Sequence, residues 1–303
     1  MDKMIDTRLY TLLAVVENNS YTKAADQLSL TQPAVTQHIK QLEKELNVRI
    51  LNRVGKEIKP TNAGNIVIQY ARRSIALYNR MKQSIIEEQR HVRRLTVGIT
   101  HTAESNAVAE VLGRYCTKNP GTTITIISDS INNLYDKLRH YEIDLAVVEG
   151  TIQDENINSL LLDTDSIMLV VSNNNPLAKK SMVTINELKK QPLILRRPSS
   201  GTRNLFAAHL ESKNMSLDDF NVILEVDNIA TIKDLIRRDI GVSVLARSAC
   251  LDELKKGKIT VLPIENLSMI REINILYHSD FEHVDILDSI MKEYNKVIKN
   301  YAS

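Results

Sequence analysis

A short segment near the N-terminus begins with polar side chains that can read the edges of DNA bases. Gln32 and Gln37 carry amides, which make paired hydrogen bonds to adenine in the major groove. Thr36 follows Gln32 by one helical turn, so on a helix it shares that face and can reach a phosphate or a thymine methyl group. Pro33 offers an apolar contact. The candidates for base contact, helix cap included, are Thr31, Gln32, Pro33, Thr36 and Gln37.

Basic side chains near this segment are suited to neutralising phosphates, which sets affinity and salt dependence without reading sequence. These candidates are Lys40, Arg53, Lys56 and Lys59. Residues 1–94 contain 16 Lys and Arg against 9 Asp and Glu, whereas residues 95–303 are net acidic. Such asymmetry is typical of a protein that meets a polyanion at one end. A polar helix face that only contacts solvent is the alternative interpretation.

Three short helical patterns are expected to position these groups. The first carries apolar residues at helical spacing from Leu9 to Val16 and is interrupted at residues 18–20. Ser20 or Thr22 can cap a second helix, which ends at Leu28. After a turn at residues 29–31, Thr31 can cap a third helix that has Pro33 in its first turn. Its buried stripe is predicted to be Val35, Ile39, Leu42 and Leu46.

The segment after these helices predicts a hairpin and then one long helix. Residues 49–60 have the pattern of two short strands that turn at Gly55, with Arg and Lys at exposed positions, which would form a basic wing. A helix is then expected from Thr61 to about Glu88. Spacings of three and four along it predict a seam on which two chains pair. The seam residues are Val67, Tyr70, Ser74, Leu77 and Met81. A helix packed on its own domain is the alternative.

Beyond Arg94 the pattern changes to alternating strands and helices. Strands at residues 95–99, 123–127 and 145–148, separated by helices, form a βαβαβ series, which predicts a parallel sheet covered by helices. Further strands are expected at residues 167–171, 193–195, 222–226, 241–245, 259–264 and 273–277, with a closing helix at about 284–298. Two α/β subdomains joined by crossings near residues 162 and 267 fit this number of strands better than one very large sheet.

Ligands of open α/β sheets bind beyond the carboxyl ends of the strands, where helix N-termini direct N–H groups inward. The residues at these places have hydroxyl groups and backbone amides that suit a small anion or carboxylate. They are Thr100, His101, Thr102, Ser128 and Glu149 in one half and Ser199, Ser200, Gly201 and Thr202 in the other. For any single residue, an ordinary helix cap is the alternative.

Several other functions lack the residues that they need. No second ligand lies at metal-binding spacing from His101, and HExxH is absent, so neither a metal nor another cofactor is expected. The sequence contains no GxGxxG, GxxxxGK[ST] or GxSxG, which argues against an enzyme. Cys116 and Cys250 are predicted to be buried, inert thiols. No apolar run reaches membrane-spanning length, so we expect a cytoplasmic protein without a membrane partner.

The N-terminal motifs resemble the DNA-binding domain of LysR-type transcriptional regulators. The resemblance spans about 65 residues and is carried by residues 20–28, 30–36, 39–43 and 60–64. The remainder is compatible in pattern with the effector domain of that family, which resembles periplasmic binding proteins. Residues 192–203 are similar to a Gly-Ser-Gly-Thr-Arg stretch of some members, but Ser199 stands where those carry Gly. Ligand identity therefore does not carry over.

The resemblance implies an α/β protein with an N-terminal winged helix-turn-helix (residues 1–60), a long linker helix for dimerisation (61–90) and an effector-binding domain (91–303). The effector domain would contain two Rossmann-like subdomains, at about 91–162 plus 267–303 and about 163–266. Expected partners are promoter DNA, a small effector, RNA polymerase as a further candidate, and a second copy of the chain, with two such pairs forming a tetramer. The alternative is a small-molecule binding protein whose basic head serves only oligomerisation.

Overall fold

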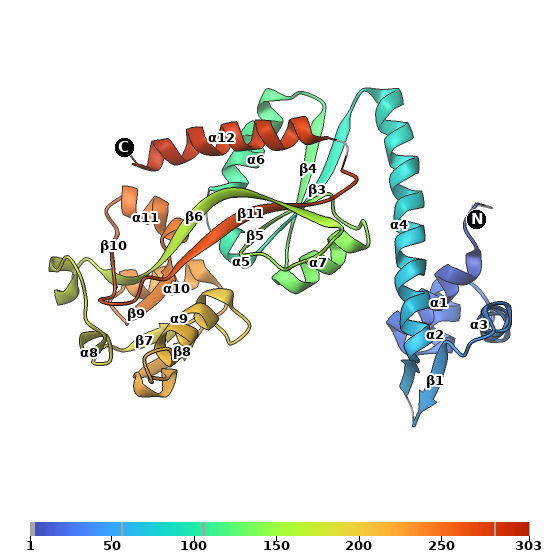
Figure 1. The fold of residues 1–303 in the computed structure, drawn as a ribbon, viewed down its shortest axis with the longest axis horizontal. Coiled ribbons are helices and arrows are strands. Elements are labelled where there is room, and N and C mark those ends of the chain that lie inside the picture. Colours follow the sequence, from blue (N-terminus) through green and yellow to red (C-terminus); the bar gives the residue numbers. More distant parts are fainter. Residues whose placement is uncertain (1–3, 56, 105–106, 282, 303) are drawn as a thin grey trace. The chain divides into compact units, whose positions relative to one another are not determined.

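The computed structural model describes residues 4–55, 57–104, 107–281 and 283–302. The chain divides into two compact units, one essentially the chain up to His91 and the other the chain from Val92 onward. Figure 1 shows the helices and strands of both units as a ribbon. None of the described helices is long and apolar enough to span a membrane.

Three capped helices open the first unit: α1 (Thr7–Asn18), α2 (Tyr21–Leu28) and α3 (Gln32–Leu46). The side chains of Ser20 and Thr31 accept hydrogen bonds from the backbone N–H groups of Lys23 and Ala34, so both predicted caps are observed. Each helix ends at a residue in the left-handed conformation, as in Schellman-type ends. These residues are Asn19, Ser29 and Asn47.

The three helices enclose a small apolar core that holds α3 in place. Val35, Ile39 and Leu42 are buried in it with Leu12 and Val15 of α1. The prediction that Leu46 continues the buried stripe was wrong, because this side chain is 46% exposed. Leu46 is the last residue of α3 and lies beyond the neighbouring helices that cover the rest of the stripe.

The predicted hairpin is present as β1 (Leu51–Val54) and β2 (Glu57–Pro60), paired antiparallel. Gly55 has a φ of +65°, which glycine adopts without strain. One carboxylate oxygen of Glu43, on α3, accepts hydrogen bonds from the backbone N–H groups of Ile50 and Leu51 at 2.8 and 3.3 Å. This contact fixes the start of the wing relative to the third helix.

The long helix α4 (Asn62–Arg90) follows directly and begins at the cap Thr61. The predicted seam residues differ in exposure. Val67 packs against the core of its own unit, whereas six large apolar side chains of α4 are between 40% and 61% exposed. These are Ile66, Tyr70, Leu77, Met81, Ile85 and Ile86.

The first half of the second unit contains β3 (Arg93–Ile99), α5 (His101–Glu104), α6 (Val108–Lys118), β4 (Thr122–Ser128), α7 (Ile131–Arg139) and β5 (Leu145–Glu149). β3 pairs parallel with both β4 and β5, as the βαβαβ pattern predicts. Helix α6 and the last helix, α12 (Val284–Ala302), contribute to one apolar core over this sheet. Their buried residues include Val111, Leu112, Ile286 and Leu287.

The second half is built around the parallel strands β7 (Leu193–Leu195), β8 (Val222–Glu225) and β9 (Val242–Ala246). Its longer helices are α9 (Gly201–Glu211) and α10 (Ile229–Arg237). Shorter elements complete it: η1 (Pro176–Lys179), α8 (Ile185–Leu188), η2 (Leu217–Asp219), η3 (Arg247–Cys250), α11 (Leu251–Lys255) and β10 (Ile259–Leu262).

Two long strands, β6 (Ile157–Ser172) and β11 (Ile270–His278), lie side by side and join the halves (Figure 1). β6 pairs with β11 along its first part and with β9 and β10 along its second. Hydrogen bonding therefore runs through one mixed sheet of nine strands, in the order β4-β3-β5-β11-β6-β9-β7-β8 with β10 on β6. The expected parallel sheet becomes mixed because β11 is antiparallel to β5 and β6.

The two cysteines differ in environment. Cys250 is buried, and burial raises its pKa to about 12, which favours the unreactive thiol. Cys116 is only half-buried, so the prediction that both thiols are buried was wrong. Its helix α6 packs its other face on the core, where Val111, Leu112 and Tyr115 lie.

Candidate functional site

The N-terminal end of α3 presents its polar side chains to solvent. Thr31, Gln32, Pro33 and Gln37 are exposed, and Thr36 is half-buried. The amide of Gln32 donates to the hydroxyl of Thr36 at 3.1 Å. Since Val35 and Ile39 hold the opposite face in the core, this polar face is rigidly oriented outward.

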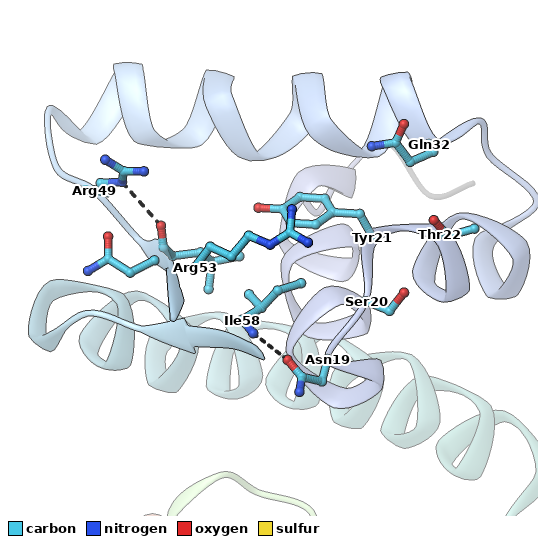
Figure 2. A pocket seen from close by; sticks show the side chains of 10 residues that line it. Asn19, Ser20, Tyr21, Thr22, Gln32, Arg49, Arg53 and Ile58 are labelled. Carbon is cyan, nitrogen blue, oxygen red and sulfur yellow. Dashed lines mark hydrogen bonds between the residues drawn. The ribbon is translucent and has the colours of Figure 1, made fainter. Parts of the chain in front are cut away.

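A pocket of about 420 Å³ adjoins this face, between α2, α3 and the wing (Figure 2). Figure 2 shows Gln32 on one side, Ser20 and Thr22 at the start of α2, and Arg49 and Arg53 on the side of β1. The wing is tied to this corner because the side chain of Asn19 accepts a hydrogen bond from the backbone N–H of Ile58 at 2.6 Å.

Of the predicted basic candidates that the structure describes, only Arg53 lines this pocket. Lys40 is exposed on α3, and Lys59 on β2 is exposed but pairs with Glu57 at 2.9 Å. Lys56 lies outside the described residues. The pocket also brings in Arg49, Asn52 and Thr22, which sequence reasoning missed. Arg49 and Arg53 are an even number of positions apart, which places both side chains on one face of an extended chain, so the sequence could have indicated that they lie together.

In the second unit, the carboxyl ends of the strands bring several predicted residues together. The hydroxyl of Thr100, after β3, donates to Oε2 of Glu149, at the end of β5, at 2.6 Å. His101 and Ser128 line a cleft of about 620 Å³ together with residues 227–230 and Lys233 of the other half. Thr102 is buried. Asp227, which lines this cleft, was not predicted as a site residue.

Two buried arginines lie near this cleft, and one of them, Arg271, contacts residues of both halves. Arg271, on β11, lies 3.4 Å from Asp165, 3.9 Å from Glu149 and 3.3 Å from the hydroxyl of Thr202. Arg196, which follows β7, has one long contact of 3.5 Å with Asp227. Glu149 and Thr202, predicted from different halves, thus meet at Arg271.

The remaining predicted residues form the start of α9. Ser199 and Gly201 are exposed, whereas Ser200 is buried at the N-cap position. Both arginines were missed by sequence reasoning. Arg196 carried a signal, since it directly follows a predicted strand at the edge where ligands bind. Arg271 carried none, because it precedes the predicted strand.

A winged helix-turn-helix followed by an α/β unit with an internal cleft defines a class of transcriptional regulators that couple DNA binding to a small molecule. The chain belongs to the LysR family. Residues 7–65 match the family model for the bacterial regulatory helix-turn-helix protein of the lysR family, and residues 88–287 match the LysR substrate binding domain. It is therefore a LysR-type transcriptional regulator with an effector-binding domain.

Among curated relatives, the HTH-type transcriptional regulator CysL of Bacillus subtilis is 26% identical over 89% of both chains. Full-length CbnR in complex with its target DNA shares the fold, with a TM-score of 0.67, 17% identity and coverage of 97% of this chain and 99% of that one. The regulatory domain of Synechocystis CcmR in complex with 2-PG also shares it, with a TM-score of 0.58 and 22% identity over 66% of this chain and 96% of that one.

Proposed function

We propose that α3 reads base sequence in the major groove through Gln32, Thr36 and Gln37, with Thr31 and Pro33 at the start of the helix. The observation that carries this proposal is the polarity of α3: its amides face outward while Val35 and Ile39 anchor the opposite side. A helix entering the groove must be fixed in this way, since base discrimination depends on the position of each donor.

Phosphate contacts are proposed for the basic groups that flank α3. Arg53 lines the pocket beside α3, Lys40 and Lys59 are exposed on α3 and β2, and Arg49 is added to them from the structure. Lys56, at the tip of the hairpin sequence, stays a candidate from the sequence alone. The hydroxyls of Ser20 and Thr22 lie at the N-terminus of α2, where a phosphate is favoured by free N–H groups and the helix dipole.

Self-association is proposed along α4. Its exposed apolar side chains Tyr70, Leu77 and Met81 follow the spacing of a coiled-coil seam and would be covered by a second copy.

We propose these domain limits: a DNA-binding domain at residues 1–60, a linker helix at 61–90 and an effector domain at 91–303. We further propose that two dimers associate into a tetramer on neighbouring half-sites.

The effector is proposed to be a small anion bound in the cleft of the second unit. Hydroxyls of Thr100, Thr102, Ser128 and Thr202 and the start of α9 are suitable donors. The 2-PG complex of CcmR supports an anionic ligand at the level of the shared fold. Effector binding would change the relative orientation of the halves and thereby the spacing of the DNA-binding domains. We expect no catalytic activity.

A mobility-shift measurement with the full chain tests the proposal. The DNA flanking its gene should be retarded more strongly than a scrambled duplex of equal length, and the preference should persist as salt rises. Equal retardation of both duplexes would contradict sequence-specific binding. It would favour the alternative, a small-molecule binding protein whose basic head serves oligomerisation.

A further inference from the structure

Two guanidinium groups are buried close to the cleft, one of them in contact with Asp227 of its lining, and part of their hydrogen-bonding capacity is unused. The side chains of Arg196 and Arg271 are 3% and 9% exposed. Within the described ranges, Nε and Nη1 of Arg196 and Nε of Arg271 have no hydrogen-bond partner. Buried donors are rarely left unpaired in folded proteins, because they have lost their hydrogen bonds to water.

The same cluster contains an unpaired acceptor. Glu149 is 9% exposed, and its Oε2 accepts the hydroxyl of Thr100. Its Oε1, in contrast, has no hydrogen-bond donor among the described residues, and the nearest guanidinium nitrogen of Arg271 lies 3.9 Å away. That separation permits attraction between the charges but is too long for a hydrogen bond.

The start of α9 adds open N–H groups beside these side chains. Its N-cap Ser200 makes no side-chain cap hydrogen bond. A Cβ added at Gly201 would meet nothing within 4 Å, so the space there is open. Thr202, in the same turn, contacts Arg271 through its hydroxyl at 3.3 Å. The helix N-terminus and the unpaired guanidinium groups are thus independent features that both favour an anion.

The electrostatics of Arg196 agree with this geometry. Burial lowers the pKa of Arg196, Asp227 and Glu149 act in the opposite direction, and the charge of Arg271 lowers it further. Asp227 is 51% exposed, and its contact of 3.5 Å is at the limit of hydrogen-bond distance. Two nearby cations in a buried site would be stabilised by an anion between them.

We propose that the effector is a small anion that also carries a hydroxyl or ammonium group. Arg196, Arg271 and the start of α9 bind the anionic group, and Oε1 of Glu149 accepts the hydroxyl or ammonium hydrogen. An anion that has only acceptors leaves Glu149 unpaired and close to a like charge, which disfavours binding. This inference rests on the proposed function of the cleft as an effector site.

Matched pairs of ligands test the donor requirement by calorimetry on the full chain. The first set is succinate, L-malate and L-aspartate, which differ by a hydrogen, a hydroxyl or an ammonium group at one carbon. The second is 3-phosphonopropionate and 2-hydroxy-3-phosphonopropionate, which differ only by one hydroxyl. At least one ligand with a hydroxyl or ammonium group should bind about tenfold or more tighter than the matched ligand that lacks this group. Equal affinities within each set, or no binding of all five at millimolar concentration, overturns the proposal.

Arg196→Met, with Arg197→Met as its control, tests the guanidinium. Arg197 is the exposed neighbour in sequence, so its loss should change neither melting temperature nor affinity. Arg196→Met should abolish detectable binding of the donor-bearing ligand, while the melting temperature of the free protein stays equal or rises, because a partly unpaired buried charge is removed. Unchanged affinity, or a fall in melting temperature with retained binding, contradicts the assignment. If Arg196→Met does not fold, the ligand affinity of Arg196→Lys and the comparison within the ligand pairs test the proposal instead.

Glu149→Gln separates the two kinds of donor. The neutral amide still accepts from a hydroxyl, whereas it loses the charge that attracts an ammonium group. The affinity for L-aspartate should therefore fall by about tenfold or more, and the affinity for L-malate should fall by less. Equal weakening, or none, contradicts the role of Glu149. Failure of this inference is distinguishable from failure of the proposed function, because the variants should all still shift promoter DNA without ligand.

Discussion

At the scale of single residues, position on α3 determines which side chains can contact a base. Gln32 lies in the first turn of the helix, is exposed, and is oriented by its hydrogen bond to Thr36. Arg53 lies on the wing side of the adjoining pocket and is the residue that we propose contacts backbone phosphate. The two residues should therefore affect DNA binding in different ways.

Gln32→Ala should weaken binding to the cognate site by about 1–3 kcal/mol and relax the base preference at one position, because a paired amide contact is lost. Competition binding against a set of single-base substitutions measures this. Arg53→Ala is the comparison: it should weaken binding to all sequences alike and reduce the salt slope by about one. A uniform loss with Gln32→Ala would refute its role in base reading.

At the scale of elements, one glycine explains how the wing and the long helix are joined. The carbonyl of Ile50 accepts a hydrogen bond from the backbone N–H of Thr61 at 2.9 Å. A Cβ added at Gly64, one turn into α4, would overlap this same carbonyl. Glycine is therefore required at position 64, because the backbones of α4 and of Ile50 approach each other closely there.

Gly64→Ala should lower the free energy of unfolding by about 1–3 kcal/mol, because the overlapping atom is backbone and can relax only if the helix moves. Gly113→Ala is the matched control, since Gly113 also lies inside a helix but its added Cβ would meet nothing within 4 Å. That change should stabilise by about 0.5–1 kcal/mol. Denaturant unfolding of both variants gives the comparison, and equal effects would refute the packing argument.

At the scale of the whole molecule, the exposed seam of α4 is the feature that a single chain does not explain. Large apolar side chains on one helix usually mark a surface that another molecule covers. Tyr70, Leu77 and Met81 follow each other at intervals of seven and four residues, which keeps them on one face.

Leu77→Glu should weaken self-association by about tenfold or more, because a charge would be buried at the paired seam. Sedimentation velocity over a concentration series measures the loss. Asn79→Glu adds the same charge at an exposed position about 200° around the helix from Leu77, and should leave association unchanged. Identical behaviour of the two variants would contradict pairing along this face.

Much of this architecture follows from local pattern. Caps at Ser20 and Thr31, the turn at Gly55 and the strands of the βαβαβ series depend on residue types and periodicity, which act over a few neighbours. The polar face of α3 follows in the same way, because the buried stripe fixes what must face outward. The motifs within residues 20–64 also indicated the family.

Only the tertiary structure decided which distant residues meet. Leu46 continues the apolar spacing of α3 but is 46% exposed, whereas Val67 of α4 packs against the core of the first unit. Arg196 and Arg271 are 75 positions apart in the sequence, and no local signal shows that both are buried close to one another. Whether a charged side chain is buried depends on contacts between residues that are far apart in the sequence. Local sequence patterns do not show those contacts.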